Sequence, residues 1–285
     1  MDVETIFNSP EARAIKDEII AVGRKLWLRQ YVDGNGGNIT CRLGDEWVIC
    51  TPTLMSKGDL SRDDLCMVDL DGNQVAGVQA RSSELLLHLE IFKAVPDARA
   101  VLHCHPPHAT AYALGGVVPP TGMLAEHEVF VGPVAFVPYE TPGTVEFARA
   151  VLPYVKDHNT VLLANHGLVC WADSVTHAEW YTEVMDTTCR VLILAGHLGT
   201  VPAQIPAAQM QGLLALKQRL GMPDARLARE GRRHWDVPEP PLGISAAATD
   251  TGGAPPVPAV AGFDQEALVQ AITERVLAAL KNDGR

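Results

Sequence analysis

Hydrophobic positions recur along the chain with two different periods, and the pattern predicts alternating helices and strands. Apolar residues at helical spacing, as in Ile15, Ile19, Val22 and Leu26, mark four segments: 10–31, 85–92, 145–155 and 175–197. Short apolar runs typical of strands occupy 39–43, 47–51, 65–70, 98–105, 134–138 and 160–164. A serine hydroxyl is expected to cap the helix at 85–92, a short helix is expected from His108, and the pair Asp71-Gly72 predicts a hairpin turn. Because the order is irregular, an α/β or α+β sandwich on a mixed sheet fits better than a doubly wound fold.

The pattern changes near the C-terminus. Residues 237–262 are rich in proline, glycine and alanine and hold few large apolar side chains, so they predict a flexible linker. Beyond it, Leu268, Ile272, Val276 and Leu280 recur every four residues and predict an amphipathic helix. We therefore expect three parts: a main domain at 1–236, a linker at 237–262 and a helix at 263–285. The helix either docks on a partner or folds back on the main domain.

Charge and composition limit the kinds of ligand that the protein is expected to bind. The 285 residues carry a formal net charge of −11, which disfavours nonspecific binding to nucleic acid or to an anionic membrane. A small anionic substrate would then be held by amides, hydroxyls and a metal ion. The N-terminus has no secretory signal pattern, and no run of about 18 apolar residues could span a bilayer. The six cysteines lack a paired spacing, so free buried thiols in a reducing cytoplasm are expected.

Three histidines are candidates for metal ligands. Alternate residues of a strand face the same side of a sheet, so His103 and His105 present two imidazoles together, and His166 follows another strand in Asn165-His166-Gly167. Three histidines with an open position are typical of catalytic zinc. An H-x-H pair alone is equally explained by ordinary core or surface histidines. A cupin barrel is disfavoured because no glutamate follows before Glu126.

A carboxylate and several polar residues complete the candidate site. Glu84 follows Ser82 and Ser83 at the expected start of a helix. It is either a first-turn acid that complements the helix dipole or a general acid/base facing the metal, and both interpretations stay open. The two serine hydroxyls, with free helix N–H groups, could bind phosphate. The loop that ends at Asn38 and the turn at Thr51-Pro52-Thr53 supply further amides and hydroxyls.

Taken together, these motifs resemble the class II aldolase/adducin family, which includes fuculose-phosphate and rhamnulose-phosphate aldolases and ribulose-phosphate 4-epimerase. The resemblance covers about the first 200 residues. It rests on Gly37-Asn38-Ile39-Thr40, Thr51-Pro52-Thr53, Ser82-Ser83-Glu84, His103-Cys104-His105-Pro106-Pro107-His108-Ala109-Thr110-Ala111, Pro138-Tyr139 and Asn165-His166-Gly167.

The resemblance implies a fold, an assembly and a set of roles. The fold would be a three-layer α/β/α sandwich on a mixed, largely antiparallel sheet, assembled as a homotetramer with active sites between subunits. The family's ligands to Zn²⁺, or to another divalent cation, fall on His103, His105 and His166. Its phosphate-binding positions fall on Asn38, Thr53, Leu54, Ser82 and Ser83. Its acid/base carboxylate falls on Glu84.

The reaction implied is retro-aldol cleavage of L-fuculose 1-phosphate or L-rhamnulose 1-phosphate to dihydroxyacetone phosphate and L-lactaldehyde. A pentulose-phosphate 4-epimerase, a decarboxylase of the same family and a noncatalytic adducin-like scaffold are the alternatives. Leu54 stands where fuculose-phosphate aldolase has glycine, and that enzyme's active-site tyrosine has no counterpart between Ala113 and Pro138. Glu126, His127 or Glu128 could substitute for the tyrosine.

The C-terminal helix resembles the encapsulation peptides that carry enzymes into bacterial microcompartments. Shell proteins are therefore expected as partners through residues 263–285, and the location would be cytoplasmic, inside such a compartment. Nucleic acid and membranes are not expected as partners.

Overall fold

The computed structural model describes residues 2–199, 202–222 and 224–227. Within these residues one mixed sheet has the strand order β4-β3-β2-β1-β5-β8-β7-β6. The strands are β1 (Asn38–Leu43), β2 (Trp47–Cys50), β3 (Cys66–Asp69), β4 (Gln74–Ala76), β5 (Ala100–Cys104), β6 (Ala135–Val137), β7 (Thr160–Leu163) and β8 (Gly167–Ala172). Neighbouring strands run antiparallel except β6 and β7, which are parallel.

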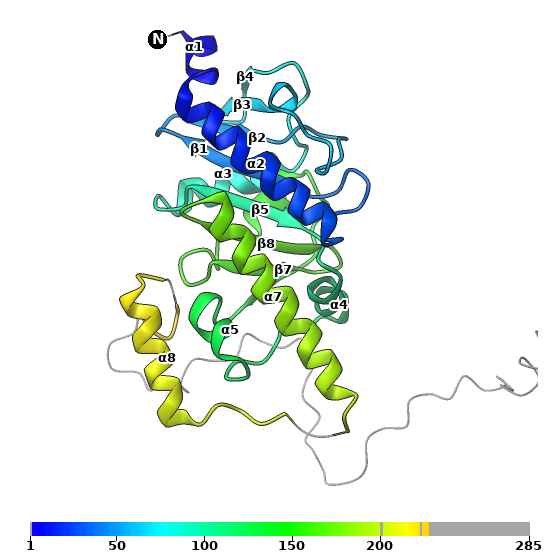
Figure 1. Ribbon diagram of the computed structural model, residues 1–285, viewed down its shortest axis with the longest axis vertical. Coiled ribbons are helices and arrows are strands. Elements are labelled where there is room, and N and C mark those ends of the chain that lie inside the picture. The colour runs from blue at the N-terminus through cyan, green and yellow to red at the C-terminus, as the bar shows by residue number, and fades with distance from the viewer. Residues whose placement is uncertain (1, 200–201, 223, 228–285) are drawn as a thin grey trace, which may run out of the picture. The chain divides into compact units, whose positions relative to one another are not determined.

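Helices cover both faces of the sheet. They are α1 (Val3–Phe7), α2 (Pro10–Leu28), α3 (Leu85–Ala94), α4 (Pro107–Gly115), α5 (Ala125–Phe130), α6 (Val145–Arg149), α7 (Val175–Gly196) and α8 (Ala207–Arg219), with a 3₁₀ turn η1 (Arg62–Asp64). In Figure 1, α2 and α7 lie across the front of the sheet and α3 lies behind it. Three layers on a mixed, largely antiparallel sheet confirm the predicted α/β/α sandwich.

The two apolar cores follow the alternation of side chains along the strands. On β5, Leu102 and Cys104 pack in the core that contains Ile19 and Leu26 of α2. Val101 packs in the opposite core, with the apolar residues of α3 and α6. Since His103 is two residues from Val101, it lies on the α3 side of the sheet, at the end of the strand.

Several boundaries differ from the sequence expectation. The predicted helix at 145–155 ends as α6 at Arg149, because Pro153 lacks an N–H to bond the Arg149 carbonyl and disfavours helical geometry at Leu152. The short helix α5 was not predicted, since His127 and Glu128 are buried where a pattern search expects apolar residues. The helix α8 was also missed because its buried residues are only Leu214 and Lys217. Strand β8 was not predicted either.

The predicted serine cap was wrong. The residue before α3 is Glu84, which makes no side-chain capping hydrogen bond. Instead the Glu84 backbone N–H donates to the Ser82 hydroxyl at 3.3 Å, within the turn that precedes the helix. The serine hydroxyl therefore shapes the turn that carries Glu84 rather than the first turn of the helix.

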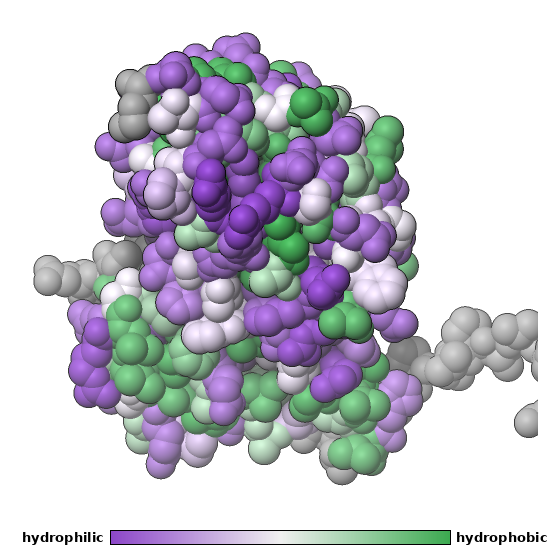
Figure 2. Space-filling view, turned by 45° about the horizontal axis from the view of Figure 1, so that its top comes forward, coloured by the Kyte–Doolittle hydropathy of each residue, from purple (hydrophilic) through white to green (hydrophobic). Residues whose placement is uncertain are grey.

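Other expectations concern the remaining residues and the surface. The predicted linker at 237–262 and helix at 263–285 lie outside the described residues. All six cysteines are buried with free thiols, as expected. No helix in the described part of the chain combines the length and apolar character needed to cross a membrane. On the face in Figure 2, hydrophilic residues dominate the upper part and apolar residues gather toward the lower edge.

Candidate metal and phosphate site

The three predicted histidines converge at one end of the sheet. Strands β5 and β8 are antiparallel neighbours in which Cys104 pairs with Leu168, so the turn before β8 lies beside the end of β5. This register brings His166 against His103 and His105, and one ring nitrogen from each of the three lies within 4.8 Å of the others. The Nε2 atoms of His103 and His105 are 3.1 Å apart.

Glycines permit this close approach. A Cβ on Gly167 would lie 2.6 Å from the Cys104 carbonyl oxygen and 2.7 Å from Cδ2 of His105. Gly37 has φ of +70°, and a Cβ there would lie 2.8 Å from the His103 carbonyl oxygen. Asn165 adopts a left-handed φ of 53° in the turn that presents His166, a conformation that asparagine tolerates better than most residues. The segments that begin β1 and β8, the two neighbours of β5, can therefore lie close to the backbone that carries His103 and His105.

The environment keeps the imidazoles able to donate lone pairs. Burial, followed by the neighbouring rings of His105 and His166, holds the pKa of His103 well below its ordinary value. Burial also lowers the pKa of His166. Nδ1 of His103 lies 2.9 Å from the Leu168 carbonyl oxygen, to which it donates, so Nε2 is left unprotonated toward the other two rings. Asp33 Oδ1 lies 3.4 Å from Nδ1 of His105, where it could orient that ring.

Glu84 faces the histidine cluster. Its Oε2 lies 3.4 Å from Nε2 of His103, and its Oε1 lies 3.5 Å from Nε2 of His166. The Asn38 side-chain amide donates to Oε2 at 2.9 Å and fixes the orientation of the carboxylate. Of the two interpretations of Glu84, the geometry favours the general acid/base, because the carboxylate is directed at the rings and makes no hydrogen bond to its own helix.

The predicted phosphate-binding residues line a cavity of about 160 Å³ beside Glu84 and His105. They are Asn38, Thr53, Leu54, Ser82 and Ser83. Leu54 has φ of 56°, in the left-handed region that favours glycine. Its side chain is 78% exposed, so it lies at the mouth of the cavity rather than filling it.

Sequence reasoning missed two charged residues near this site. Asp33 belongs to the glycine-rich loop, and its place beside His105 depends on a contact between segments far apart in the chain. Lys57 is buried, and its ammonium group donates to backbone carbonyls of the loops next to the cavity. No spacing or motif in the sequence indicates that this lysine is buried.

The proposed substitutes for the missing tyrosine lie in or at the start of α5. Glu128 is buried and forms an ion pair of 2.7 Å with Arg226, and its other oxygen accepts a hydrogen bond from the Gly122 N–H. Burial lowers the pKa of His127 to about 4. Glu126 is exposed. None of the three lines the site cavity, so within one chain they do not complete the site.

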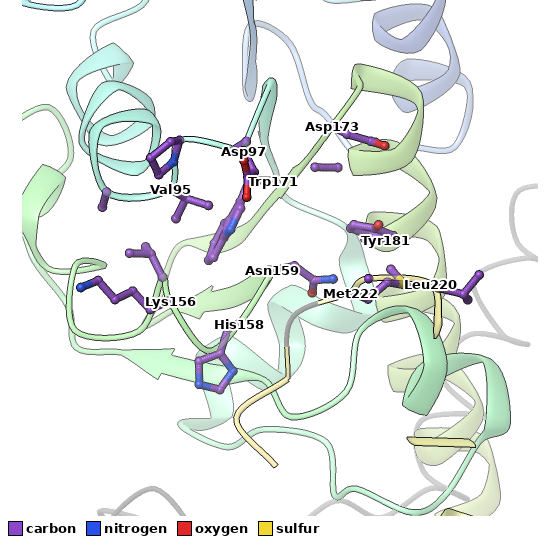
Figure 3. A pocket seen from close by; sticks show the side chains of 16 residues that line it. Val95, Asp97, Lys156, His158, Asn159, Trp171, Asp173, Tyr181, Leu220 and Met222 are labelled. Atoms are coloured by element: carbon purple, nitrogen blue, oxygen red, sulfur yellow. The ribbon is translucent and has the colours of Figure 1, made fainter. Parts of the chain in front are cut away.

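A larger cavity, of about 510 Å³, lies elsewhere (Figure 3). Its lining includes Ala98, before β5, and Trp171 and Asp173 at the end of β8, which places it at the opposite ends of these strands from the histidines. It holds none of the predicted site residues. The residues predicted to form the site therefore gather at the smaller cavity.

The chain is a mixed α/β sandwich in which three histidines, a glutamate and a polar cavity lie together at one end of the sheet. These features are typical of metal-dependent enzymes that act on small anionic substrates. Comparison with known proteins gives the family. The model of the class II aldolase and adducin N-terminal domain matches residues 17–193, and the chain belongs to that family. It is an enzyme of the lyase type, and class II aldolases depend on a divalent metal ion.

Three relatives illustrate the range within the family. The chain is 34% identical over 186 residues to the L-fuculose phosphate aldolase of Methanococcus maripaludis, covering 64% of this chain and 97% of the relative. It is 31% identical to the 5-deoxy-D-ribulose 1-phosphate aldolase of Bacillus thuringiensis, over 70% of this chain and 92% of that protein. It is 33% identical to the 3-oxo-tetronate 4-phosphate decarboxylase of Cupriavidus necator, over 62% of this chain and 82% of that protein.

Solved structures agree with the fold. An L-fuculose 1-phosphate aldolase superposes with a TM-score of 0.66 at 26% identity, covering 73% of this chain and 97% of the other. YgbL of Klebsiella pneumoniae gives a TM-score of 0.67 at 28% identity, covering 72% and 100%.

Proposed function

We propose that this protein cleaves a deoxyketose 1-phosphate by a metal-dependent retro-aldol reaction. The preferred substrates are L-fuculose 1-phosphate and L-rhamnulose 1-phosphate, with dihydroxyacetone phosphate and L-lactaldehyde as products. The observation that carries the proposal is the convergence of His103, His105 and His166 with Glu84 beside a hydroxyl-lined cavity. Two of the relatives reported above are aldolases whose substrates are sugar phosphates.

The histidine cluster suits a divalent cation, and zinc in particular. The three imidazoles are close together, and the two whose pKa values are lowered by burial are neutral at pH 7. When bound, the cation supplies a Lewis acid that polarises the substrate carbonyl and stabilises the negative charge that develops as the carbon–carbon bond breaks. The Leu168 carbonyl lies against Nδ1 of His103, and the Asp33 carboxylate lies against Nδ1 of His105, so each orients its ring.

The chain's own residues bind the substrate and move the proton. Hydroxyls of Thr53, Ser82 and Ser83 and the side chain of Asn38 would hold the phosphate. When the C3–C4 bond breaks, its electron pair passes to C3, and the C4 hydroxyl gives its proton to a base and becomes the aldehyde. Glu84 would return a proton to C3, and its contact with Asn38 keeps the carboxylate aligned for that transfer.

A homotetramer with sites between subunits is part of the proposal. The base that accepts the C4 hydroxyl proton is then supplied by a neighbouring chain, since the residues of α5 do not line the cavity. Exposed apolar side chains on α4 and near the end of α7 support association: Leu114 is 69% exposed, Leu194 61% and Leu198 75%. Sedimentation velocity tests this assembly, and a monomer at micromolar concentration would refute it.

We also propose that residues 263–285 deliver the 1–236 domain to a bacterial microcompartment through the 237–262 linker. The support is the amphipathic spacing of the terminal segment and the composition of the segment before it. Deletion of residues 264–285 should leave cleavage activity intact and abolish co-purification with shell proteins. Loss of folding or of activity would contradict this role and indicate a helix that belongs to the main domain.

A coupled assay tests the reaction. The metal-loaded enzyme is incubated with fuculose, rhamnulose and 5-deoxyribulose 1-phosphates while dihydroxyacetone phosphate is measured, and with ribulose 5-phosphate while epimerisation is followed. The proposal predicts dihydroxyacetone phosphate from at least one deoxyketose phosphate. The second candidate is a decarboxylase, favoured by identity of 30% and 33% to two 3-oxo-tetronate 4-phosphate decarboxylases. Release of carbon dioxide from 3-oxo-tetronate 4-phosphate, without cleavage of any deoxyketose 1-phosphate, would refute the aldolase proposal and support a decarboxylase.

A further inference from the structure

In the described part of the chain, no carboxylate lies within ion-pair distance of the buried Lys57 ammonium group. Its side chain is 1% exposed, and its Nζ donates to the carbonyl oxygens of Asn35 at 2.9 Å and of Met55 at 2.7 Å. Burial lowers its pKa to about 8, while the more distant Glu84 carboxylate acts in the opposite direction. An ammonium group held by neutral carbonyls retains most of the cost of leaving water, so it invites an anion nearby.

The two carbonyls belong to two loops that supply residues to the candidate phosphate cavity. Asn35 lines the cavity from the glycine-rich loop, and Met55 directly follows Leu54, another lining residue. Lys57 itself is absent from the lining, and its ammonium group links the two loops through their carbonyls. The lining contains no lysine or arginine, and its acidic member is Glu84. Apart from the metal ion proposed at the histidines, Lys57 therefore supplies a buried positive charge close to this lining.

Helix α2 keeps the lysine in place. A Cβ on Gly23 would lie 2.7 Å from the Lys57 carbonyl oxygen, which shows how closely the helix backbone packs on this residue. The next residue, Gly58, lies against the Trp27 ring, with 2.7 Å between a built Cβ and Cγ. The backbone at Lys57 and Gly58 is therefore closely packed on α2, and the two carbonyl hydrogen bonds hold the buried ammonium group away from solvent.

We propose that Lys57 makes the cavity selective for a phosphomonoester dianion. Held by Asn35 and Met55, its ammonium group supplies the charge that the lining lacks and fixes the spacing of the two loops. It is a positioning and specificity residue, since it does not touch the substrate. The inference rests on the proposed function, because it takes the cavity as the phosphate site.

Binding of glycerol 3-phosphate to the metal-loaded enzyme, measured by calorimetry, tests the proposal. Lys57→Met should weaken binding at least about tenfold, since the dianion loses its buried partner charge. Lys16→Met is the matched control: Lys16 is 4% exposed and stacks on the Phe7 ring at 3.2 Å, and its loss should change affinity less than about twofold. Equal affinity of wild type and Lys57→Met would overturn the proposal.

A measurement in the wild-type protein does not depend on how the variant folds. Nitrogen-15 NMR of labelled lysine should show the pKa of Lys57 rising from about 8 when glycerol 3-phosphate saturates the enzyme, because the dianion favours the charged form. An unchanged pKa would overturn the role. Wild type that binds this ligand through Lys57 but cleaves no ketose phosphate would refute the proposed reaction and leave the lysine's role standing. Absence of binding to wild type refutes both.

Discussion

Substitution of Gly167 by alanine should damage the metal site without touching any proposed ligand. The new Cβ would lie 2.6 Å from the Cys104 carbonyl oxygen and 2.7 Å from Cδ2 of His105, whereas ordinary contacts begin at 3.4 Å. Both neighbours must therefore retreat by most of an ångström. One belongs to the β5 backbone and the other to a proposed ligand, so the strain falls directly on the geometry of the histidine cluster.

The magnitude follows from these contacts. Overpacking of this kind costs about 1–3 kcal/mol of unfolding free energy. Displacement of a ligand ring has an effect like that of losing an outer hydrogen-bond partner, about 10–100-fold in metal affinity. Chemical denaturation measures the first quantity and competition with a fluorescent zinc chelator the second.

Gly212→Ala is the matched control. Gly212 lies inside α8, and a Cβ there meets nothing within 4 Å. Alanine at this position should raise the unfolding free energy by about 0.5–1 kcal/mol and leave metal affinity unchanged. If Gly167→Ala binds metal as tightly as wild type and is equally stable, the close packing of the β8 turn on β5 is not what fixes the site.

Three further outcomes are expected. Glu84→Gln should retain metal and substrate binding but lower the rate of C3 protonation about 10²–10⁴-fold, as steady-state and proton-exchange rates can show; near-normal turnover would assign the proton transfer to another group. A strong chelator should abolish activity, and zinc should restore it; full activity of metal-free enzyme would contradict a metal-dependent reaction. Burial lowers the pKa of His127 to about 4, so its contribution to stability is present above the unfolded pKa of about 6.5 and is lost as pH falls toward 4. His127→Phe should therefore flatten the decline of unfolding free energy between pH 6.5 and 4, and an unchanged slope would contradict this.

The sequence signals for the histidine end of the fold are largely local. Strand alternation predicted that His103 and His105 lie together, and their rings are neighbours although His105 directly follows the end of β5. The turn at Asn165-His166-Gly167 is marked by residues that tolerate its backbone. The register of β5 with β8, which brings His166 to the other two, is a long-range pairing that no periodicity specifies. It came instead from the family resemblance.

Other features depended on tertiary context. Lys57 and Glu128 are both buried, although no pattern in the sequence indicates burial. Their partners are remote in the chain: the Asn35 carbonyl for Lys57 and Arg226 for Glu128. The helix α5 escaped prediction for the same reason, since its buried positions are polar. The predicted serine cap of α3 was wrong because the Ser82 hydroxyl accepts the Glu84 N–H in the turn before the helix, where it positions Glu84.

The central claim is that three imidazoles bind one divalent cation beside Glu84, and anomalous diffraction from crystals of the metal-loaded enzyme tests it most directly. Data collected at the zinc absorption edge should give one peak per chain, about 2.0–2.1 Å from a ring nitrogen of each of His103, His105 and His166. Crystals with no peak there, or with the peak bound by other residues, would contradict the account.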